Sequence, residues 1–335
     1  MTVSPNPRLV VSDFVFGSAD RQRLEAALAP GALLLVKDNA DLPDVLRAHP
    51  DTDVLCTFRP PADTLALAPN LRWLAMPSAG ADGAIRAGLL AAEAERPLLV
   101  TTANGVHAVP ITEFVFGALL MLVRRWPDIL TLQSERTWPD HQGWLRLGGR
   151  ELYGSTLGVV GLGAIGRQIA RIGRAFGMRV VATRRTVTPG ATDPDLDALY
   201  PTDTLRALLA ESDFVVLAVP ATTTTRHLIG ADELGAMKPT AMLVNIARGS
   251  VIDQPALIAA LQNGTISGAA LDVFEQEPLP ADSPLWTLPN VLVSPHISGS
   301  TNRYSHRFTD LLLDNLTRYR AGQPLINLVD SARGY

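Results

Sequence analysis

The residues Leu157-Gly158-Val159-Val160-Gly161-Leu162-Gly163-Ala164-Ile165-Gly166 indicate the fold most directly. An apolar run predicts a buried strand, and the spacing G-x-G-x-x-G follows it directly. In such a unit the first glycine permits a tight turn, the second lets a pyrophosphate approach, and the third allows close helix–strand packing. Free N–H groups at the helix N-terminus then favour phosphate. Such hexapeptides occur by chance, but this context predicts a dinucleotide-binding turn that contacts the cofactor through Gly161, Gly163, Ala164, Ile165 and Gly166.

Short apolar runs alternate with helical patterns on both sides of this stretch. Leu33–Lys37 and Val54–Phe58 precede it, and Phe214–Val219 and Met242–Ile246 follow it. Continuous apolar runs are typical of strands buried on both faces, and their alternation with helices favours parallel sheets covered by helices. A chain of 335 residues is long enough for two such domains. We therefore predict the α/β fold class, with one αβ series in each half of the chain.

A long apolar helix is predicted between the two series, over roughly Ile111 to Arg125. Trp126-Pro127 should end it, because proline disfavours helix at the residue before it. Thr137–Arg150 is rich in glycine, tryptophan and polar residues, which predicts a loop or linker. The apolar helix could line an interface between two copies of the chain or pack inside one copy, and its pattern fits both.

The composition argues against several classes of protein. Hydrophobic residues make up 47% and charged residues 19%, so the chain can bury a large core and is not disordered. A net charge of -4 without long charged blocks gives no reason to expect nucleic acid. Cys56 is the only cysteine, so a disulfide within the chain and a cysteine metal site are not expected. No apolar run reaches the ~20 residues of a membrane helix, and the N-terminus lacks a signal-peptide pattern. We expect a cytoplasmic protein with no metal and no membrane partner.

The strand after the glycine-rich turn should end near the ribose of a bound dinucleotide. An acid there binds the 2′-hydroxyl of NAD, whereas arginine suits the 2′-phosphate of NADP. The sequence has no acid at this point and reads Thr183-Arg184-Arg185. An arginine fork matches phosphate geometry, although solvated surface arginines are also common. We therefore expect NADP(H) in preference to NAD(H), with Thr183, Arg184 and Arg185 at the 2′-phosphate.

Arg248, Glu277 and His296 each come just after an apolar run of the second half. Ligands of doubly wound sheets bind at the carboxyl ends of the strands, where these side chains would lie. An imidazole can donate or accept a proton, a guanidinium can bind a carboxylate, and a carboxylate can orient an imidazole. Each residue could be structural on its own, but their joint placement predicts a catalytic set.

Six stretches carry a family resemblance: Gly161–Gly166, Asn245-Ile246-Ala247-Arg248-Gly249, Leu271–Leu279, Ser294–Gly299, Pro77–Asp82 and Asn104–His107. Together they resemble the D-isomer-specific 2-hydroxyacid dehydrogenase family, and the acid-free strand end Thr183-Arg184-Arg185 resembles its glyoxylate/hydroxypyruvate reductases that prefer NADPH. The resemblance extends over nearly the whole chain. It implies two Rossmann-like doubly wound parallel-sheet domains, with a discontinuous substrate domain of residues 1–103 plus 299–335 and a dinucleotide-binding domain of residues 104–298.

The resemblance also implies an activity. The enzyme would transfer a hydride between nicotinamide and C2 of a small 2-oxo or 2-hydroxy acid of the glyoxylate or hydroxypyruvate kind, and it would be a homodimer. His296 would be the general acid/base, Glu277 its partner, and Arg248 a ligand of the substrate carboxylate. Asp272 would lie near the nicotinamide amide. The other implied residues are Ser78, Ala79 and Gly80 at the substrate, and Pro220, Thr225, Ile246, Ala247 and Gly299 at the dinucleotide.

Two other functions remain open at this point. Some family members are dinucleotide-sensing corepressors that bind partner proteins, although the intact Arg248, Glu277 and His296 set argues against that role. A related dehydrogenase could use phosphite or a phosphorylated substrate, which the loops of the first half would decide. Trp144 and His306 could line the pocket, but a structural role is the default for both.

Overall fold

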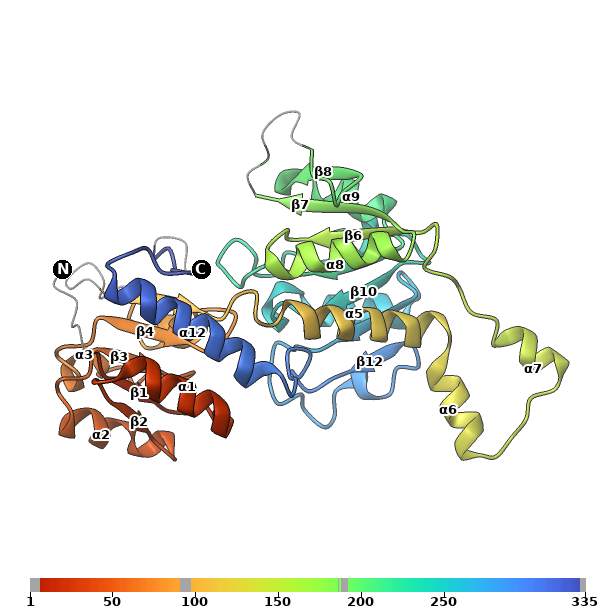
Figure 1. The fold of residues 1–335 in the computed structure, drawn as a ribbon. Coiled ribbons are helices and arrows are strands. Elements are labelled where there is room, and N and C mark those ends of the chain that lie inside the picture. The colour runs from red at the N-terminus through yellow and green to blue at the C-terminus, as the bar shows by residue number, and fades with distance from the viewer. Residues whose placement is uncertain (1–6, 91–97, 186, 188–191, 332–335) are drawn as a thin grey trace. The chain divides into compact units, whose positions relative to one another are not determined.

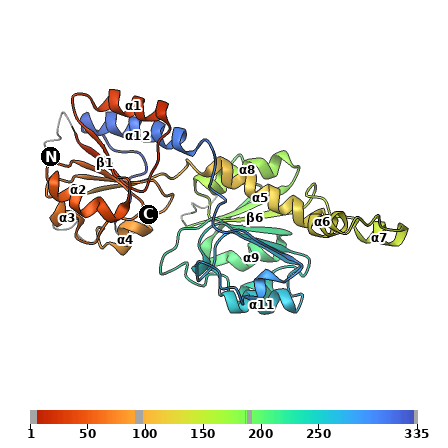
Figure 2. The ribbon, with the colours of Figure 1, turned by 90° about the horizontal axis from the view of Figure 1, so that it is seen from below.

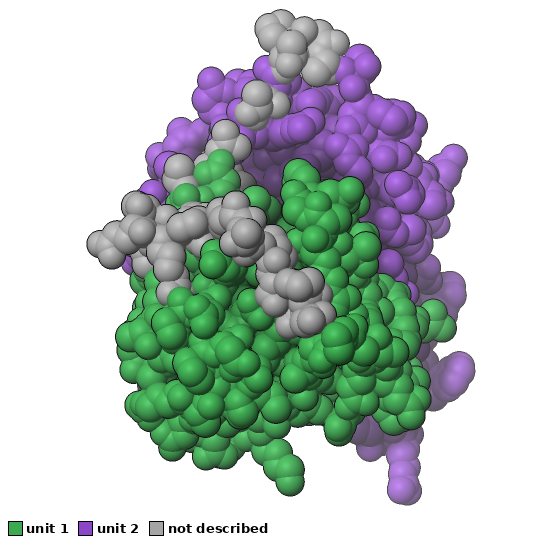
Figure 3. Space-filling model, turned by 60° about the vertical axis from the view of Figure 1, so that its left-hand side comes forward, with its two compact units in different colours: residues 1–107, 301–335 green, residues 108–300 purple. Residues whose placement is uncertain are grey.

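The computed structural model of this chain describes residues 7–90, 98–185, 187 and 192–331. Two compact units divide the chain, one of residues 1–107 and 301–335 (unit 1) and one of residues 108–300 (unit 2), coloured separately in Figure 3. Unit 1 is therefore built from both ends of the chain. The boundaries lie within a few residues of the divisions that the family resemblance implies.

In the described part of unit 1, five parallel strands pair in the order β2-β1-β3-β4-β5. Strands β1, β3 and β4 are buried throughout, as continuous apolar runs predict. The five strands are β1 (Leu9–Val11), β2 (Leu33–Leu35), β3 (Val54–Cys56), β4 (Trp73–Met76) and β5 (Leu99–Thr102).

Helices cover both faces of the unit 1 sheet. Figure 2 shows α1 and α12 on one face and α2, α3 and α4 on the other. Helix α12 belongs to this unit because Phe308, Leu312 and Leu316 recur on one side of it and pack into the core beside α1. The helices are α1 (Ser18–Leu28), α2 (Leu42–Ala48), α3 (Thr64–Leu67), α4 (Asp82–Arg86) and α12 (Tyr304–Arg320), with the 3₁₀ turn η1 (Asn39–Asp41).

In the described part of unit 2, seven parallel strands pair in the order β12-β11-β10-β9-β6-β7-β8. The order changes direction between β6 and β9, and ligands bind at such a switch point in doubly wound sheets. The strands are β6 (Thr156–Val160), β7 (Arg179–Arg184), β8 (Ala198–Pro201), β9 (Phe214–Leu217), β10 (Met242–Asn245), β11 (Gly268–Leu271) and β12 (Val291–Val293). Strand β8 is the one that the apolar pattern did not predict, because it lies at the sheet edge and is only partly buried.

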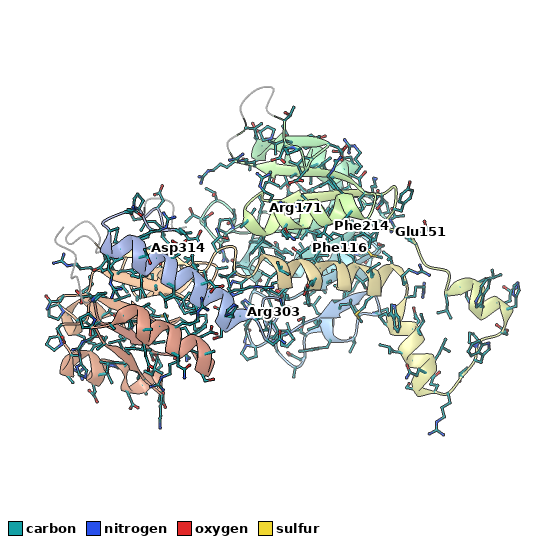
Figure 4. All side chains as sticks on the ribbon, viewed as in Figure 1. Phe116, Glu151, Arg171, Phe214, Arg303 and Asp314 are labelled. Carbon is teal, nitrogen blue, oxygen red and sulfur yellow. The ribbon has the colours of Figure 1, made fainter. Side chains whose placement is uncertain are left out.

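Two cores lie on the two faces of this sheet. Figure 2 shows α5 and α8 on one face and α9 and α11 on the other. Phe116 of α5 and Phe214 of β9, labelled in Figure 4, belong to the same core, beneath the first of these faces. The helices are α5 (Ala108–Val123), α8 (Ala164–Ala175), α9 (Leu205–Glu211), α10 (Ala231–Ala236) and α11 (Gln254–Gln262), with 3₁₀ turns η3 (Thr202–Thr204), η4 (Gly249–Val251) and η5 (Pro284–Trp286). The expected fold class is confirmed for both units.

Two further helices, α6 (Trp126–Ser134) and α7 (His141–Arg146), correct the expectation for the middle of the chain. Trp126-Pro127 does not only end the preceding helix but begins α6, where proline is tolerated because a first-turn N–H has no helical partner. Arg125, with φ 55°, makes the break between α5 and α6. Helix α7 lies in the segment expected to be a loop, and Figure 1 shows both helices extending away from the sheet of unit 2. Among the described residues, no helix has the length and apolarity to cross a membrane.

Candidate active site

The three glycines of the turn after β6 occupy three different environments. Gly161 has φ +102°, and a Cβ there would lie 2.8 Å from the carbonyl oxygen of Ala218. A Cβ on Gly166 would lie 2.1 Å from the carbonyl oxygen of Gly161, so helix α8 approaches the turn as closely as the motif requires. A Cβ on Gly163 would meet no heavy atom within 4 Å. The turn therefore leaves open the side on which a pyrophosphate is expected.

Helix α8 begins at this open side. Its first internal hydrogen bond runs from the N–H of Arg167 to the carbonyl of Gly163. The first N–H groups of a helix have no acceptor within that helix. In α8 these are the N–H groups of Ala164, Ile165 and Gly166. They carry the positive end of the helix dipole and can bind an anion.

The strand end at Thr183-Arg184-Arg185 divides into one buried hydroxyl and two exposed cations. Thr183 is buried, and its Oγ1 accepts a hydrogen bond of 3.2 Å from the N–H of Gly161. Thr183 therefore braces the glycine-rich turn. Arg184 and Arg185 are both exposed at the end of β7. The sequence does not show that Thr183 is buried while the two arginines are exposed, because burial at a strand end depends on the elements packed against it.

Arg248, Glu277 and His296 lie beyond three neighbouring strands of unit 2. Strands β10, β11 and β12 pair in parallel, with Asn245 opposite Leu271 and Leu271 opposite Val293. Their carboxyl ends therefore lie at one edge of the sheet, which is also the edge of the glycine-rich turn.

The imidazole of His296 and the carboxylate of Glu277 form a hydrogen-bonded pair. Nδ1 of His296 lies 2.8 Å from Oε2 of Glu277, and both side chains are partly exposed. Oε1 of Glu277 accepts a bond of 3.0 Å from the N–H of Phe274, which fixes the carboxylate. No hydrogen bond joins Nε2 of His296 to any residue that the structure describes. The pair thus leaves one imidazole nitrogen available for proton transfer.

The loop that carries His296 is held by Asp272. This carboxylate is buried at the end of β11. Its Oδ1 accepts from the hydroxyl of Ser294 (2.7 Å) and the N–H of Ile297 (2.9 Å), and its Oδ2 accepts from the N–H of Ser298 (3.0 Å). His296 lies between these anchors with φ +56°, a conformation uncommon outside glycine. Both oxygens of Asp272 are thus committed to the loop, an arrangement that residue spacing does not predict.

Asn245 and Gly249, to which the sequence analysis assigned no role, position Arg248. The side-chain amide of Asn245 accepts from the N–H of Ala247 (3.0 Å) and donates to the carbonyl of Arg248 (3.1 Å). Nη1 of Arg248 donates to the carbonyl of Ala247 at 2.7 Å. A Cβ on Gly249 would lie 1.8 Å from the carbonyl carbon of Phe274, so the Arg248 loop packs directly on the Glu277 loop. The sequence does hold a sign of this role, because Asn245 is a polar residue inside an otherwise apolar strand.

A second histidine–glutamate pair joins loops of the same unit. Nε2 of His227 lies 2.6 Å from Oε1 of Glu275, and the N–H of His227 donates to the carbonyl of Ser250. In the preceding loop, the hydroxyl of Thr225 donates to the carbonyl of Pro220 at 2.7 Å. The hydroxyl of Thr225 therefore stabilises the conformation of its own loop. Of the other residues expected at the dinucleotide, Ile246 and Ala247 are buried after β10, and Gly299 follows the His296 loop.

The expected substrate loop, Pro77 to Gly80, follows β4 in unit 1. The carbonyl of Ser78 accepts from the N–H of Ala103 (2.8 Å), and the carbonyl of Gly80 accepts from the hydroxyl of Ser78 (2.6 Å). The hydroxyl of Tyr304 donates to the carbonyl of Pro77. Within the described residues, the N–H groups of Ser78, Ala79 and Gly80 donate no hydrogen bond. The loop therefore has three bonded carbonyl groups and three N–H groups that remain available for an anion.

The sequence left the roles of Trp144 and His306 open. Trp144 lies on α7, about two-thirds exposed, beside His141. His306 lies on α12, where its Nδ1 is 3.0 Å from Oδ1 of Asp20 on α1. That contact gives His306 the structural role of joining two helices. Among the described residues, no group of histidine, cysteine, aspartate and glutamate side chains is arranged to hold a metal ion.

The chain is similar to known proteins over most of its length. The family model "D-isomer specific 2-hydroxyacid dehydrogenase, NAD binding domain" matches residues 116–298. A glyoxylate reductase of Korarchaeum cryptofilum is 38% identical over 270 residues, which cover 80% of this chain and 79% of that protein.

Solved structures of similar proteins cover almost the whole chain. A D-isomer specific 2-hydroxyacid dehydrogenase family protein from Aeromonas salmonicida has a TM-score of 0.82 and 33% identity, covering 97% of this chain and 99% of its own. A D-isomer specific 2-hydroxyacid dehydrogenase from Xanthobacter autotrophicus, solved with NADPH and MES, has a TM-score of 0.81 and 30% identity, with coverages of 98% and 99%. The chain therefore belongs to the D-isomer specific 2-hydroxyacid dehydrogenase family and is an NAD(P)-dependent oxidoreductase that acts on CH–OH groups.

Proposed function

We propose that this enzyme reduces a small 2-oxo acid, of the glyoxylate or hydroxypyruvate kind, to the 2-hydroxy acid and prefers NADPH as the hydride donor. The observation that supports this most is the His296–Glu277 pair, with Nε2 of the imidazole left for a substrate and Arg248 beyond the neighbouring strand. The glyoxylate reductase of Korarchaeum cryptofilum supports the substrate class.

The residues of unit 2 fit a bound dinucleotide. Gly161 turns the backbone at a positive φ, and Gly163 leaves space beside the first turn of α8. The N–H groups of that turn suit the pyrophosphate. The exposed Arg184 and Arg185 would hold a 2′-phosphate, while the NADPH complex of the Xanthobacter autotrophicus relative supports the same cofactor.

The chemistry follows from what each side chain can donate. When bound, the nicotinamide supplies the hydride that reaches C2. His296 then gives the proton on Nε2 to the carbonyl oxygen, and Glu277 stabilises the imidazolium and fixes its ring through Nδ1. Arg248 binds the substrate carboxylate by charge-assisted hydrogen bonds and orients C2. In unit 1, the N–H groups of the loop from Ser78 to Gly80 would bind a carboxylate of the substrate.

A substrate panel tests the proposal. NADPH oxidation would be followed with glyoxylate, hydroxypyruvate, pyruvate and phenylpyruvate, and the first two should give the highest kcat/KM. Tight NADPH binding without turnover of any acid would contradict the proposal and favour a dinucleotide-sensing corepressor-like protein of the same fold.

The cofactor preference has its own test. Replacing Arg184 and Arg185 by alanine should lower kcat/KM for NADPH about 10- to 100-fold, the loss expected for hydrogen bonds to a charged group. The value for NADH should stay within about twofold, because NADH lacks the 2′-phosphate. Equal losses with both cofactors would contradict the assignment of these arginines.

We also propose that the enzyme is a homodimer. Helices α6 and α7, described in full, bury none of their residues, and the connecting segment exposes 95% of Trp138. Trp126 and Trp144 are also exposed, so this part of unit 2 offers large apolar side chains to a second copy. Light scattering after gel filtration should give twice the 35.9 kDa chain mass, and a monomer at micromolar concentration would refute the dimer.

A further inference from the structure

The hydroxyl of Tyr304 is a polar group that no step of the proposed reaction uses. Tyr304 is the first residue of α12, next to Arg303, whose label marks this end of the helix in Figure 4. Its ring packs against Phe14 (centroids 5.4 Å apart) and against the imidazole of His107 (4.8 Å). Burial raises the pKa of the Tyr304 phenol, so the hydroxyl keeps its proton and remains a hydrogen-bond donor.

That hydroxyl donates to the carbonyl of Pro77, the first residue of the loop with available N–H groups. The carbonyl of Pro77 and the N–H of Ser78 belong to one planar trans peptide and point in opposite directions. Fixing this carbonyl therefore fixes the direction of the N–H of Ser78. The bond from Ala103 to the carbonyl of Ser78 fixes the N–H of Ala79 in the same way.

We infer that Tyr304 is a positioning residue for the carboxylate of the substrate, an inference that depends on the proposed function of the Ser78–Gly80 loop. It holds the Pro77–Ser78 peptide plane so that the N–H of Ser78 is directed to the carboxylate before substrate arrives. Preorganised donors bind an anion without first reorienting. The carboxylate takes no part in the bond changes at C2, so these donors bind the ground state and the transition state alike, and their loss raises KM more than it lowers kcat.

The substitution Tyr304→Phe removes only the hydroxyl and keeps the ring in its aromatic contacts. The chain offers a matched control on the same helix, Tyr319→Phe. The Tyr319 hydroxyl is buried and has no hydrogen-bond partner among the described residues, while its ring packs on Trp73 with centroids 5.6 Å apart. Both variants delete one phenol oxygen from α12, but only the first releases the carbonyl of Pro77.

The experiment measures kcat, KM for glyoxylate, KM for NADPH and the melting temperature of both variants. In Tyr304→Phe, KM for glyoxylate should rise roughly 3- to 10-fold, as the loss of one net hydrogen bond predicts. Its kcat and its KM for NADPH should stay within about twofold, and Tyr319→Phe should match the wild type in all three. An unchanged KM for glyoxylate in Tyr304→Phe overturns the inference. So do parallel losses in both variants, because they would come from the helix as a whole.

A binding measurement separates this inference from the proposed function. Oxalate, which carries two adjacent carboxylates, would be titrated calorimetrically into each variant with NADPH present. Weaker oxalate binding by Tyr304→Phe than by Tyr319→Phe supports the inference, even if the wild type reduces no 2-oxo acid and the proposed function fails. Equal oxalate affinity in the two variants, or no oxalate binding by the wild type, overturns the inference.

Discussion

The substitution Asp272→Asn tests whether this buried carboxylate acts through the His296 loop. Oδ1 accepts two of its three bonds and Oδ2 the third. Asparagine can place its single oxygen at the Oδ1 position, but its NH₂ group then faces the N–H of Ser298, donor against donor. One bond to a charged group is lost, about 1.5–3 kcal/mol, and the other two lose their charge assistance. We expect the free energy of unfolding to fall by about 2–4 kcal/mol.

The effect on catalysis should be distinct from an effect on the cofactor. His296 lies between the anchored residues Ser294 and Ile297, so a looser anchor displaces the imidazole, and misplacement on the order of 1 Å can reduce a rate about 100-fold. We expect kcat to fall about 10- to 100-fold, with a smaller change in KM for NADPH.

Urea unfolding and steady-state kinetics measure both quantities for Asp272→Asn. Asp282→Asn is the matched control, because Asp282 is exposed and the exchange is chemically the same. The reasoning is refuted if Asp272→Asn keeps wild-type stability and kcat. A rise in KM for NADPH alone would show that Asp272 binds nicotinamide rather than supporting the loop.

Three further results are expected. His296→Ala should lower kcat by ~10²–10⁴-fold in stopped-flow reduction of glyoxylate, and near-normal kcat would remove this imidazole from the mechanism. Gly163→Ala should weaken NADPH binding and leave the melting temperature of the free enzyme unchanged, because the added Cβ meets no atom. Gly166→Ala should lower that melting temperature, because its Cβ would lie 2.1 Å from the carbonyl oxygen of Gly161. Calorimetry measures binding and melting temperature, and the reverse pattern would contradict the geometry. Burial opposes ionisation of Asp20, but hydrogen bonds from His306, Ser305 and Arg23 outweigh it and lower the Asp20 pKa. Because the Asp20 pKa is lower in the folded protein than in the unfolded chain, where it is near 4, the ionised carboxylate stabilises the fold above about pH 4. This contribution disappears as the pH falls. The difference in free energy of unfolding between wild type and Asp20→Asn should therefore shrink between about pH 5 and pH 3 in urea unfolding.

Most of the fold could be predicted because its strands are buried on both faces and appear as uninterrupted apolar runs. The exceptions have a common cause. Strand β8 lies at a sheet edge and is half-buried, and helices α6 and α7 bury no side chain, so neither has the apolar pattern on which prediction relies. Pro127 is compatible with the end of one helix and with the first turn of the next, and the sequence does not distinguish the two.

The candidate site, like the fold, could be predicted only in part. Polar residues after apolar runs mark the carboxyl ends of strands, so residue order is enough to place Arg248, Glu277 and His296 at those ends. The contacts of these residues, in contrast, are seen only in the folded chain. The bonds of Asp272 to the His296 loop, of His227 to Glu275 and of Tyr304 to Pro77 join positions far apart in the chain. Such contacts depend on strand order and on the direction of individual peptide planes, which packing fixes and residue spacing does not encode.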